Sequence, residues 1–224
     1  MYPENHSTPA VEDYAKAIYS LTGARAETAS TTDLADRLGL TPSSVSAMLR
    51  KLGQDGTVEH VPYHGVRLTP KGERIALAVL RRHRLLELFL AETLGVPWDR
   101  VHREAEVLEH SLSDELTELM AAKLGNPSVD PHGDPIPTRE LDMVEPPTRD
   151  LTELEPGEKA TFVRVSDSDP EMLGYLSELG VSIGQELVMI GQQPFDGPFE
   201  VRAGDRTVAL GRNLCRAMRM DGPG

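Results

Sequence analysis

A stretch rich in proline and acidic residues, from about residue 126 to 158, divides the chain into two parts. Proline lacks a main-chain N–H and clashes inside a helix, so no continuous helix crosses this stretch. Before it, apolar residues recur at helical spacing. After it, over about residues 159–220, short segments alternate apolar and polar residues between Gly and Asp turns. The sequence therefore predicts a mainly α chain with a small C-terminal β-barrel, interrupted by one helix near residues 170–178.

Composition narrows the class of protein. Cys215 is the one cysteine among 224 residues, so no internal disulfide can form, which favours a reducing compartment. No stretch approaches 18 consecutive apolar residues, and the first residues are polar and acidic. We therefore expect a cytoplasmic protein with no membrane partner. A thiolate zinc cage needs more sulfur, so His, Asp and Glu would have to hold any metal ion.

Charge is distributed unevenly along the chain. The net charge is −13, yet residues 1–82 hold 10 Lys and Arg against 9 Asp and Glu. Within residues 25–82 the basic groups outnumber the acidic ones by 9 to 6. This front end could bind DNA phosphates although the rest of the chain is strongly acidic. An uneven surface without function is the alternative.

The front of the chain has the pattern of a winged helix-turn-helix. After a helix over residues 11–22, two short helices are predicted over 31–39 and 41–54, and a hairpin follows over 57–69. Small hydroxyl residues at the start of the second short helix would let it enter a major groove, with basic residues near the phosphates. The candidate DNA-binding residues are Thr41, Pro42, Ser43, Ser44, Ser46, Arg50 and Lys51. The alternative is a helical hairpin with a merely polar face.

Imidazoles and carboxylates recur at helical spacing in the middle of the chain. Two long helices are predicted, over residues 76–95 and 99–122. The first carries His83 and Glu87 at i and i+4. The second carries a set of His and Glu on one flank: His102, Glu106, Glu109 and His110. Such a set without sulfur suits Mn(II) or Fe(II). Salt-bridged surface helices would give the same pattern, and spacing alone does not separate the two.

Taken together, these segments resemble the diphtheria toxin repressor family of metal-dependent transcriptional repressors, and within it the manganese transport regulators. The matching segments are VEDYAKAIY, TPSSVSAMLRKL, VRLTPKG, RRHRLLELFL, VHREAEVLEHSLSDEL, DPHGDPIP and VSDSDPEMLGYLSELGVSIG. The resemblance implies four ranges: a winged helix-turn-helix DNA-binding domain over 1–75, a helical dimerisation and metal-binding domain over 76–140, an acidic Pro-rich linker over 141–158, and an SH3-like β-barrel over 159–224.

The resemblance also implies two metal sites per chain. The regulatory site would use Asp13, Glu106, Glu109 and His110. The second site would use His83, Glu87 and His102, completed by a barrel carboxylate, either Asp167 or Asp169. Iron-sensing members have Met at the position of Asp13 and Cys at that of Glu106, so oxygen ligands here favour Mn(II). Lys16 replaces a Glu that some short manganese regulators use to bridge two ions, so two separated sites are expected.

The implied function is a Mn(II)-dependent repressor that binds a palindromic operator as a homodimer and represses metal-uptake genes. Fe(II)-dependent repression of iron uptake is the alternative within the family. A carboxylate/histidine metalloenzyme is the alternative outside it, but no nucleophile–base pair adjoins the ligands, so no catalytic site is predicted. The dimer surface is expected among the apolar residues Leu85, Leu86, Leu88, Phe89 and Leu112.

Overall fold

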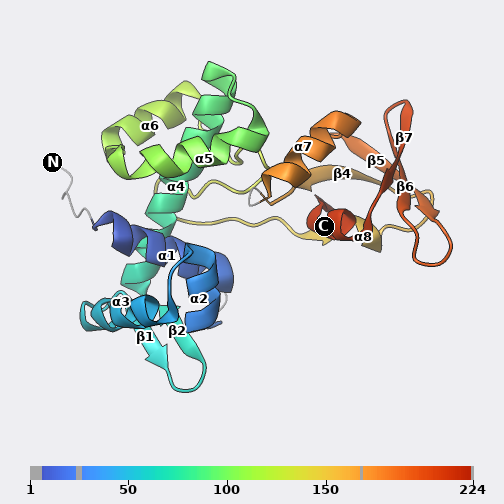
Figure 1. Cartoon of the computed structure of the whole chain (residues 1–224). Helices are drawn as coiled ribbons and strands as arrows, with labels where there is room; N and C mark the ends of the chain where they lie inside the picture. Colours follow the sequence, from blue (N-terminus) through green and yellow to red (C-terminus); the bar gives the residue numbers. More distant parts are fainter. Residues whose placement is uncertain (1–6, 24–26, 167–168, 223–224) are drawn as a thin grey trace. The chain divides into compact units, whose positions relative to one another are not determined.

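The computed structural model describes residues 7–23, 27–166 and 169–222. Contacts divide the chain into two units, one of residues 1–82 with 137–142 and one of residues 83–136 with 143–224. A long helix, α4 (Pro70–Leu94), runs through the point of division (Figure 1). Helices precede a small antiparallel sheet in the chain, so the predicted fold class is confirmed. Among the described residues, no helix is both long and apolar enough to cross a membrane.

The first unit is a winged helix-turn-helix. Its elements before α4 are α1 (Pro9–Thr22), α2 (Thr31–Leu38), α3 (Pro42–Gln54), β1 (Val58–Val61) and β2 (Gly65–Leu68). Gly39, in the left-handed region, ends α2, and the Thr41 side chain caps α3 by accepting a hydrogen bond from the Ser44 N–H. Ile18, Leu34 and Leu52 are fully buried between the helices. A continuous apolar core therefore fixes α3 within this unit.

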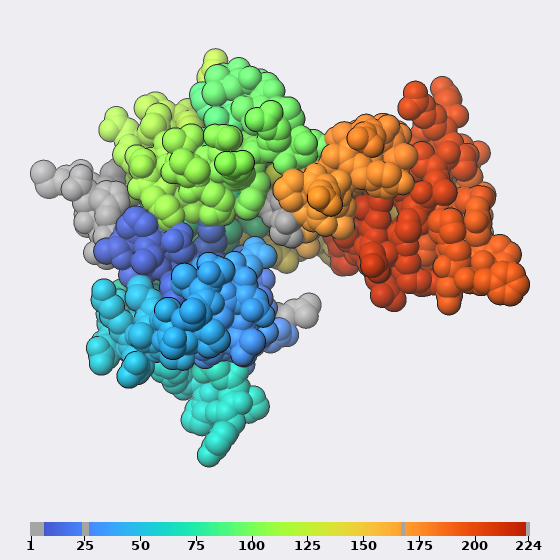
Figure 2. All heavy atoms as spheres, in the orientation of Figure 1, coloured from blue at the N-terminus to red at the C-terminus, as the bar shows by residue number. Residues whose placement is uncertain are grey.

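The wing is anchored to the helices by its own backbone. Strands β1 and β2 pair antiparallel, and Val66 also pairs with Ala29 before α2. A Cβ at Gly65 would lie 2.2 Å from the Ala29 carbonyl oxygen, so only glycine permits this approach. Figure 2 shows the hairpin, in cyan, projecting from the surface of this unit. The wing is thus held firmly beside α3.

The helical part of the second unit differs from the prediction in one respect. Residues 99–122 form α5 (Trp98–Leu108), a 3-10 turn η1 (Glu109–Ser111) and α6 (Asp114–Lys123) in place of one helix. Leu112 is extended, and the Ser113 side chain caps α6 by accepting from the Leu116 N–H. This local cap competes successfully with continuation of the helix. Glu109 and His110 therefore stand on a tight turn.

The expected dimer surface was partly wrong. Leu85, Leu86 and Leu88 are at most 8% exposed and form the core between α4 and its neighbours. Their side chains satisfy an internal requirement of the helical domain. Exposed apolar side chains occur elsewhere on the same unit, at Leu94 and around Leu108.

The C-terminal part is a six-stranded antiparallel sheet in the order β3-β8-β4-β5-β6-β7. Its elements are β3 (Thr148–Asp150), η2 (Leu151–Glu153), β4 (Lys159–Arg164), α7 (Pro170–Leu179), β5 (Glu186–Gln192), β6 (Phe199–Ala203), β7 (Arg206–Leu210), α8 (Arg212–Ala217) and β8 (Arg219–Asp221). Phe162, Leu176 and Cys215 are fully buried in its core. The sequence predicts a linker over 141–158, whereas β3 within that range pairs with β8 in the sheet. The 3-10 turn η2 packs on the same core, because Leu151 and Leu154 are buried there.

Candidate metal centre

His83 on α4 lies at the centre of a cluster of imidazoles and carboxylates. Its Nε2 is 3.0 Å from Glu87 Oε1 and 3.1 Å from His102 Nδ1. On its other side, His83 Nδ1 is 2.5 Å from Glu109 Oε2 and 3.9 Å from Glu106 Oε1. Helical spacing aligns His83 with Glu87, and His102 with Glu106. The ligand atoms of His83, His102 and Glu106 lie within 4.8 Å of one another, close enough for one metal ion.

A second group is fully buried on the other side of Glu87. Glu87, Asp130 and His132 also bring three ligand atoms within 4.8 Å of one another. Glu87 Oε1 faces the two imidazoles of the first group, whereas Glu87 Oε2 is 4.0 Å from His132 Nδ1. The carboxylate of Glu87 therefore stands between the two groups.

A tight turn over residues 130–134 positions the second group. Asp130 Oδ1 accepts hydrogen bonds from the His132 N–H at 2.8 Å and the Asp134 N–H at 2.9 Å. Gly133 has a φ of +83°, and a Cβ there would lie 1.8 Å from the Val163 carbonyl oxygen. Arg84 Nε is 3.7 Å from Asp130 Oδ2 and supplies partial charge balance. The turn thus fixes both side chains before any ligand is added.

The buried polar atoms of this turn fit a cation. Asp130 Oδ2 and His132 Nδ1 are buried, and neither has a hydrogen-bond partner among the described residues. Burial, Asp134 and Glu87 raise the pKa of the Asp130 carboxyl well above its usual range. His132 Nε2 is 2.7 Å from the Trp98 carbonyl oxygen, which can only accept, so Nε2 holds the proton and Nδ1 presents its lone pair. A divalent ion would satisfy both atoms and would favour the charged form of the Asp130 carboxylate.

The helix ligands predicted for the second site lie in one unit, whereas those predicted for the regulatory site are divided between the two units. His83, Glu87 and His102 meet, as predicted for the second site. Glu109 and His110 adjoin, with His110 Nε2 3.5 Å from Glu109 Oε1. Glu106, assigned to the regulatory site, also lies against His83 and His102.

The remaining predicted ligands lie on other elements. Asp13 is half-buried on α1 in the other unit. Asp169 is exposed and caps α7, accepting from the Met172 N–H at 3.1 Å. Asp167 lies outside the described residues. The barrel carboxylate of the second site therefore stays a prediction.

Sequence reasoning missed Asp130 and His132 as candidate ligands. Their only signal is D-P-H-G, an Asp and a His two residues apart in a Pro- and Gly-rich loop. Because the pattern has no helical or strand period, it could not be placed against Glu87 from spacing alone. Tertiary folding brings together a helix residue and two loop residues more than 40 positions away.

The α3 surface has the character predicted for DNA contact. All seven candidate residues, from Thr41 to Lys51, are exposed. Thr41 Oγ1 is 2.9 Å from both Ser43 Oγ and Ser44 Oγ, so the hydroxyls form a cluster at the helix N-terminus. Tyr63, in the turn between β1 and β2 at the tip of the adjoining wing, is fully exposed and has a left-handed φ of +66°. Helix and wing together present a polar, partly basic face.

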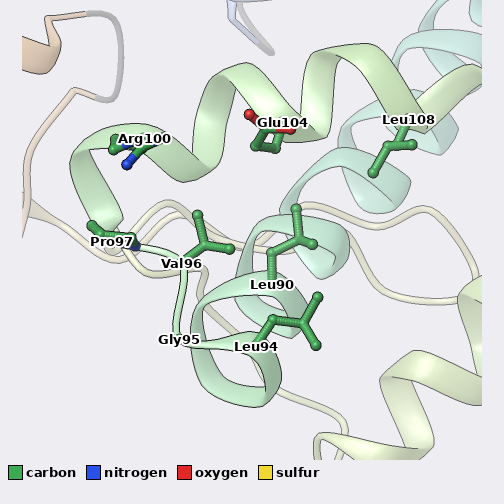
Figure 3. Close-up of a pocket in the computed structure, with 8 residues that line it drawn as sticks. All are labelled: Leu90, Leu94, Gly95, Val96, Pro97, Arg100, Glu104 and Leu108. Carbon is green, nitrogen blue, oxygen red and sulfur yellow. The ribbon is translucent and has the colours of Figure 1, made fainter.

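A shallow apolar groove follows the end of α4 and one side of α5 (Figure 3). Its volume is about 450 Å³, and its lining residues are Leu90, Leu94, Gly95, Val96, Pro97, Arg100, Glu104 and Leu108. Leu94 is 65% exposed and Leu108 42% exposed, and Val107 beside them is 71% exposed. This is a concentration of apolar side chains that a lone chain leaves in water.

Models of three known domain families match successive parts of the chain. A DNA-binding domain model described as "Iron dependent repressor, N-terminal DNA binding domain" matches residues 6–66. The model "Iron dependent repressor, metal binding and dimerisation domain" matches residues 69–138, and the "FeoA domain" model matches residues 149–220.

Individual proteins agree with these matches. The iron-dependent repressor IdeR of Mycobacterium tuberculosis is 30% identical over 97% of this chain and 99% of its own. The diphtheria toxin repressor of Corynebacterium glutamicum is 31% identical over 84% of this chain and 86% of its own. A solved structure described as a manganese-dependent transcriptional repressor in complex with manganese is 41% identical, with a TM-score of 0.87 over 95% of this chain and all of that chain.

The fold, the ligand cluster and the polar, partly basic face of α3 together define a metal-responsive DNA-binding protein. The chain belongs to the diphtheria toxin repressor family of metal-dependent transcriptional repressors, in the branch of the manganese regulators.

Proposed function

We propose that this protein is a Mn(II)-dependent transcriptional repressor that binds a palindromic operator as a homodimer and represses metal-uptake genes. The observation that carries the proposal is the ligand cluster around His83 and Glu87, which offers oxygen and imidazole nitrogen and no sulfur. Hard oxygen ligands suit Mn(II), and sulfur would favour softer ions. As a repressor, the protein would act in the cytoplasm.

The proposal includes two metal sites per chain. The regulatory site would be formed by Asp13, Glu106, Glu109 and His110. The second would use Glu87 with His83 and His102, and the buried Asp130 and His132 extend it beyond the three ligands inferred from the resemblance. The orphaned atoms Asp130 Oδ2 and His132 Nδ1 support this extension.

Activation would work as a population shift. Asp13 belongs to the unit that carries α3, whereas Glu106, Glu109 and His110 belong to the other unit. Without a cation these carboxylates repel one another, which favours varied arrangements of the units. A divalent ion supplies the positive charge that lets them converge. The two α3 helices of a dimer would then be held at the spacing of successive major grooves.

Arg50 is proposed to contact a DNA phosphate. Arg50→Ala should weaken binding to every sequence and flatten the slope of log affinity against log salt by about one per chain, because one counterion fewer is released. Fluorescence anisotropy at several salt concentrations measures this slope. Arg202→Ala on β6, which removes an arginine that is also exposed but lies on the barrel, is the control and should leave the slope unchanged. An unchanged slope for Arg50→Ala would exclude the phosphate contact.

The groove beside α5 is proposed as part of the homodimer interface. Leu108→Glu should raise the dimer dissociation constant by roughly 100-fold, because a carboxylate would be buried against apolar side chains. Sedimentation velocity over a concentration series measures the change. Val144→Glu, at a side chain that is 71% exposed outside the groove, is the matched control. If Leu108→Glu stayed dimeric, the interface would lie elsewhere, with Leu116 and Leu119 on α6 the next exposed candidates.

Two other functions share features of this chain. An Fe(II)-dependent repressor would share the fold, and the iron-dependent relatives keep this alternative open. A metalloenzyme is disfavoured because the family consists of repressors. The direct test is to select an operator from random duplexes with Mn(II) present and to measure its binding with and without the ion. Metal-independent binding, or none, would refute the proposed function.

A further inference from the structure

Trp98, the only tryptophan of the chain, lies between the buried ligand group and the barrel. Its main-chain oxygen accepts a hydrogen bond from His132 Nε2 at 2.7 Å. Its indole stacks on the His132 ring, with centroids 5.9 Å apart and an interplanar angle of 21°. Its Nε1–H donates to Ser177 Oγ on α7 at 2.6 Å, and its ring packs against the barrel core. One residue thus contacts a candidate metal ligand and a barrel helix.

The same turn meets the barrel through its backbone. The Val165 N–H donates to the His132 carbonyl oxygen at 3.0 Å. Gly133 lies so close to the Val163 carbonyl that no side chain fits. Within the second unit, therefore, His132 touches the barrel directly at the end of β4 and indirectly, through Trp98, at α7. A change in the position of the His132 ring would therefore alter the contacts at the end of β4 and at α7.

We propose that Trp98 is a positioning residue that couples occupancy of the Glu87–Asp130–His132 group to the docking of the barrel through Ser177. The inference rests on the proposed function, because it takes this group to be a metal site. A cation on His132 Nδ1 would fix the plane of the imidazole. The stacked indole, already held by the same histidine, would then keep its N–H aimed at Ser177. His102 follows Trp98 by one helical turn on α5, so the imidazole of His102 and the indole share one rigid helix.

The coupling must act in both directions. If a bound ion favours the docked barrel, a docked barrel raises the affinity for the ion by the same factor. Loss of the indole–Ser177 contact should therefore lower the affinity for the ion without removing any ligand. This separates a positioning role from a ligand role, because a ligand variant changes the number of ions bound.

The experiment compares Trp98→Ala, Trp98→Phe and Ser177→Ala in the full chain. All three keep the main-chain carbonyl that holds His132, and Trp98→Phe also keeps an aromatic ring. Mn(II) binding is followed by electron paramagnetic resonance, and amide hydrogen exchange over α7 is followed by mass spectrometry. In the wild type, Mn(II) should slow exchange over α7 by about five-fold, a coupling at the lower end of the usual range.

The variants should bind the same number of ions but lose most of this added protection, with Trp98→Ala affected most. The double variant Trp98→Phe with Ser177→Ala should be no worse than either single one, because both remove the same hydrogen bond. Ser177→Thr, which keeps a hydroxyl, should restore the response. A merely structural role would raise exchange over α7 equally with and without the ion.

Three outcomes would overturn the coupling while leaving the proposed function intact. One is a wild type that binds Mn(II) with no change over α7. Another is a full response in Trp98→Ala, and the third is additive losses in the double variant. If instead Asp130→Asn binds as many ions as the wild type, the buried group is not a metal site, and both proposals for that group fail together.

Discussion

Replacing Asp13 by alanine is expected to leave a dimer that still folds and still binds metal at its second site, but whose operator binding no longer responds to Mn(II). We expect the Mn(II)-dependent gain in operator affinity to fall by roughly 100-fold, near the upper end of typical coupling between sites. The reason is that Asp13 is the only proposed regulatory ligand on the unit that carries α3. Anisotropy titrations of the operator at fixed salt and saturating Mn(II) give the loss.

Two variants control this experiment. Asp13→Asn keeps the size of the side chain but is a weaker ligand, so it should behave like the alanine variant. Asp205→Ala removes one exposed carboxylate from the barrel, and it should respond to Mn(II) like the wild type. Normal activation of Asp13→Ala would contradict the proposal that a metal ion links the two units through Asp13. A monomeric Asp13→Ala would mean that α1 takes part in the dimer interface.

The second large effect concerns the choice of ion. The double change Asp13→Met with Glu106→Cys replaces two oxygen ligands by two sulfur ligands, and the response should shift from Mn(II) toward Fe(II). Softer sulfur ligands favour the later ion of the series, whereas oxygen ligands tolerate the larger Mn(II). We expect the ratio of Mn(II) to anaerobic Fe(II) concentrations for half-maximal operator binding to rise by at least roughly ten-fold.

An unchanged ratio would place metal selectivity outside these two residues. The buried group of Glu87, Asp130 and His132 would then be the next candidate, because it also offers oxygen and nitrogen only. The single changes Asp13→Met and Glu106→Cys serve as controls for loss of activation, since either one would lower the affinity for all ions alike if it only removed a ligand. Only a change in the ratio, rather than in overall affinity, reports selectivity.

Local patterns in the sequence predicted most of the fold. The Thr-Pro start of α3 and the glycine after α2 mark helix ends by simple capping chemistry, and both occur as predicted. Strand alternation located most of the barrel. The break between α5 and α6 was not predicted, because Ser113 reads as an ordinary helix-surface residue until its capping hydrogen bond to the Leu116 N–H is seen.

Features that depend on tertiary folding could not be predicted from the sequence. The leucines on α4 have the same helical spacing whether they face a partner chain or their own domain. Leu85, Leu86 and Leu88, expected at the dimer surface, therefore lie in the core of their own domain. The Asp130–His132 turn gave no periodic signal, and the sequence gives no sign that Trp98 contacts a candidate ligand. Its contacts with His132 and Ser177 join segments 34 and 79 positions away, which no local pattern encodes.

The most direct test of the central claim is operator binding by the wild-type chain, titrated in parallel with Mn(II), anaerobic Fe(II) and Zn(II) at one salt concentration. We predict that Mn(II) activates binding at least as well as Fe(II). Zn(II), which prefers four ligands, should bind yet activate less, because it would hold the units in a less productive arrangement. Activation by Fe(II) without activation by Mn(II) would contradict the account and make this chain an iron-responsive repressor.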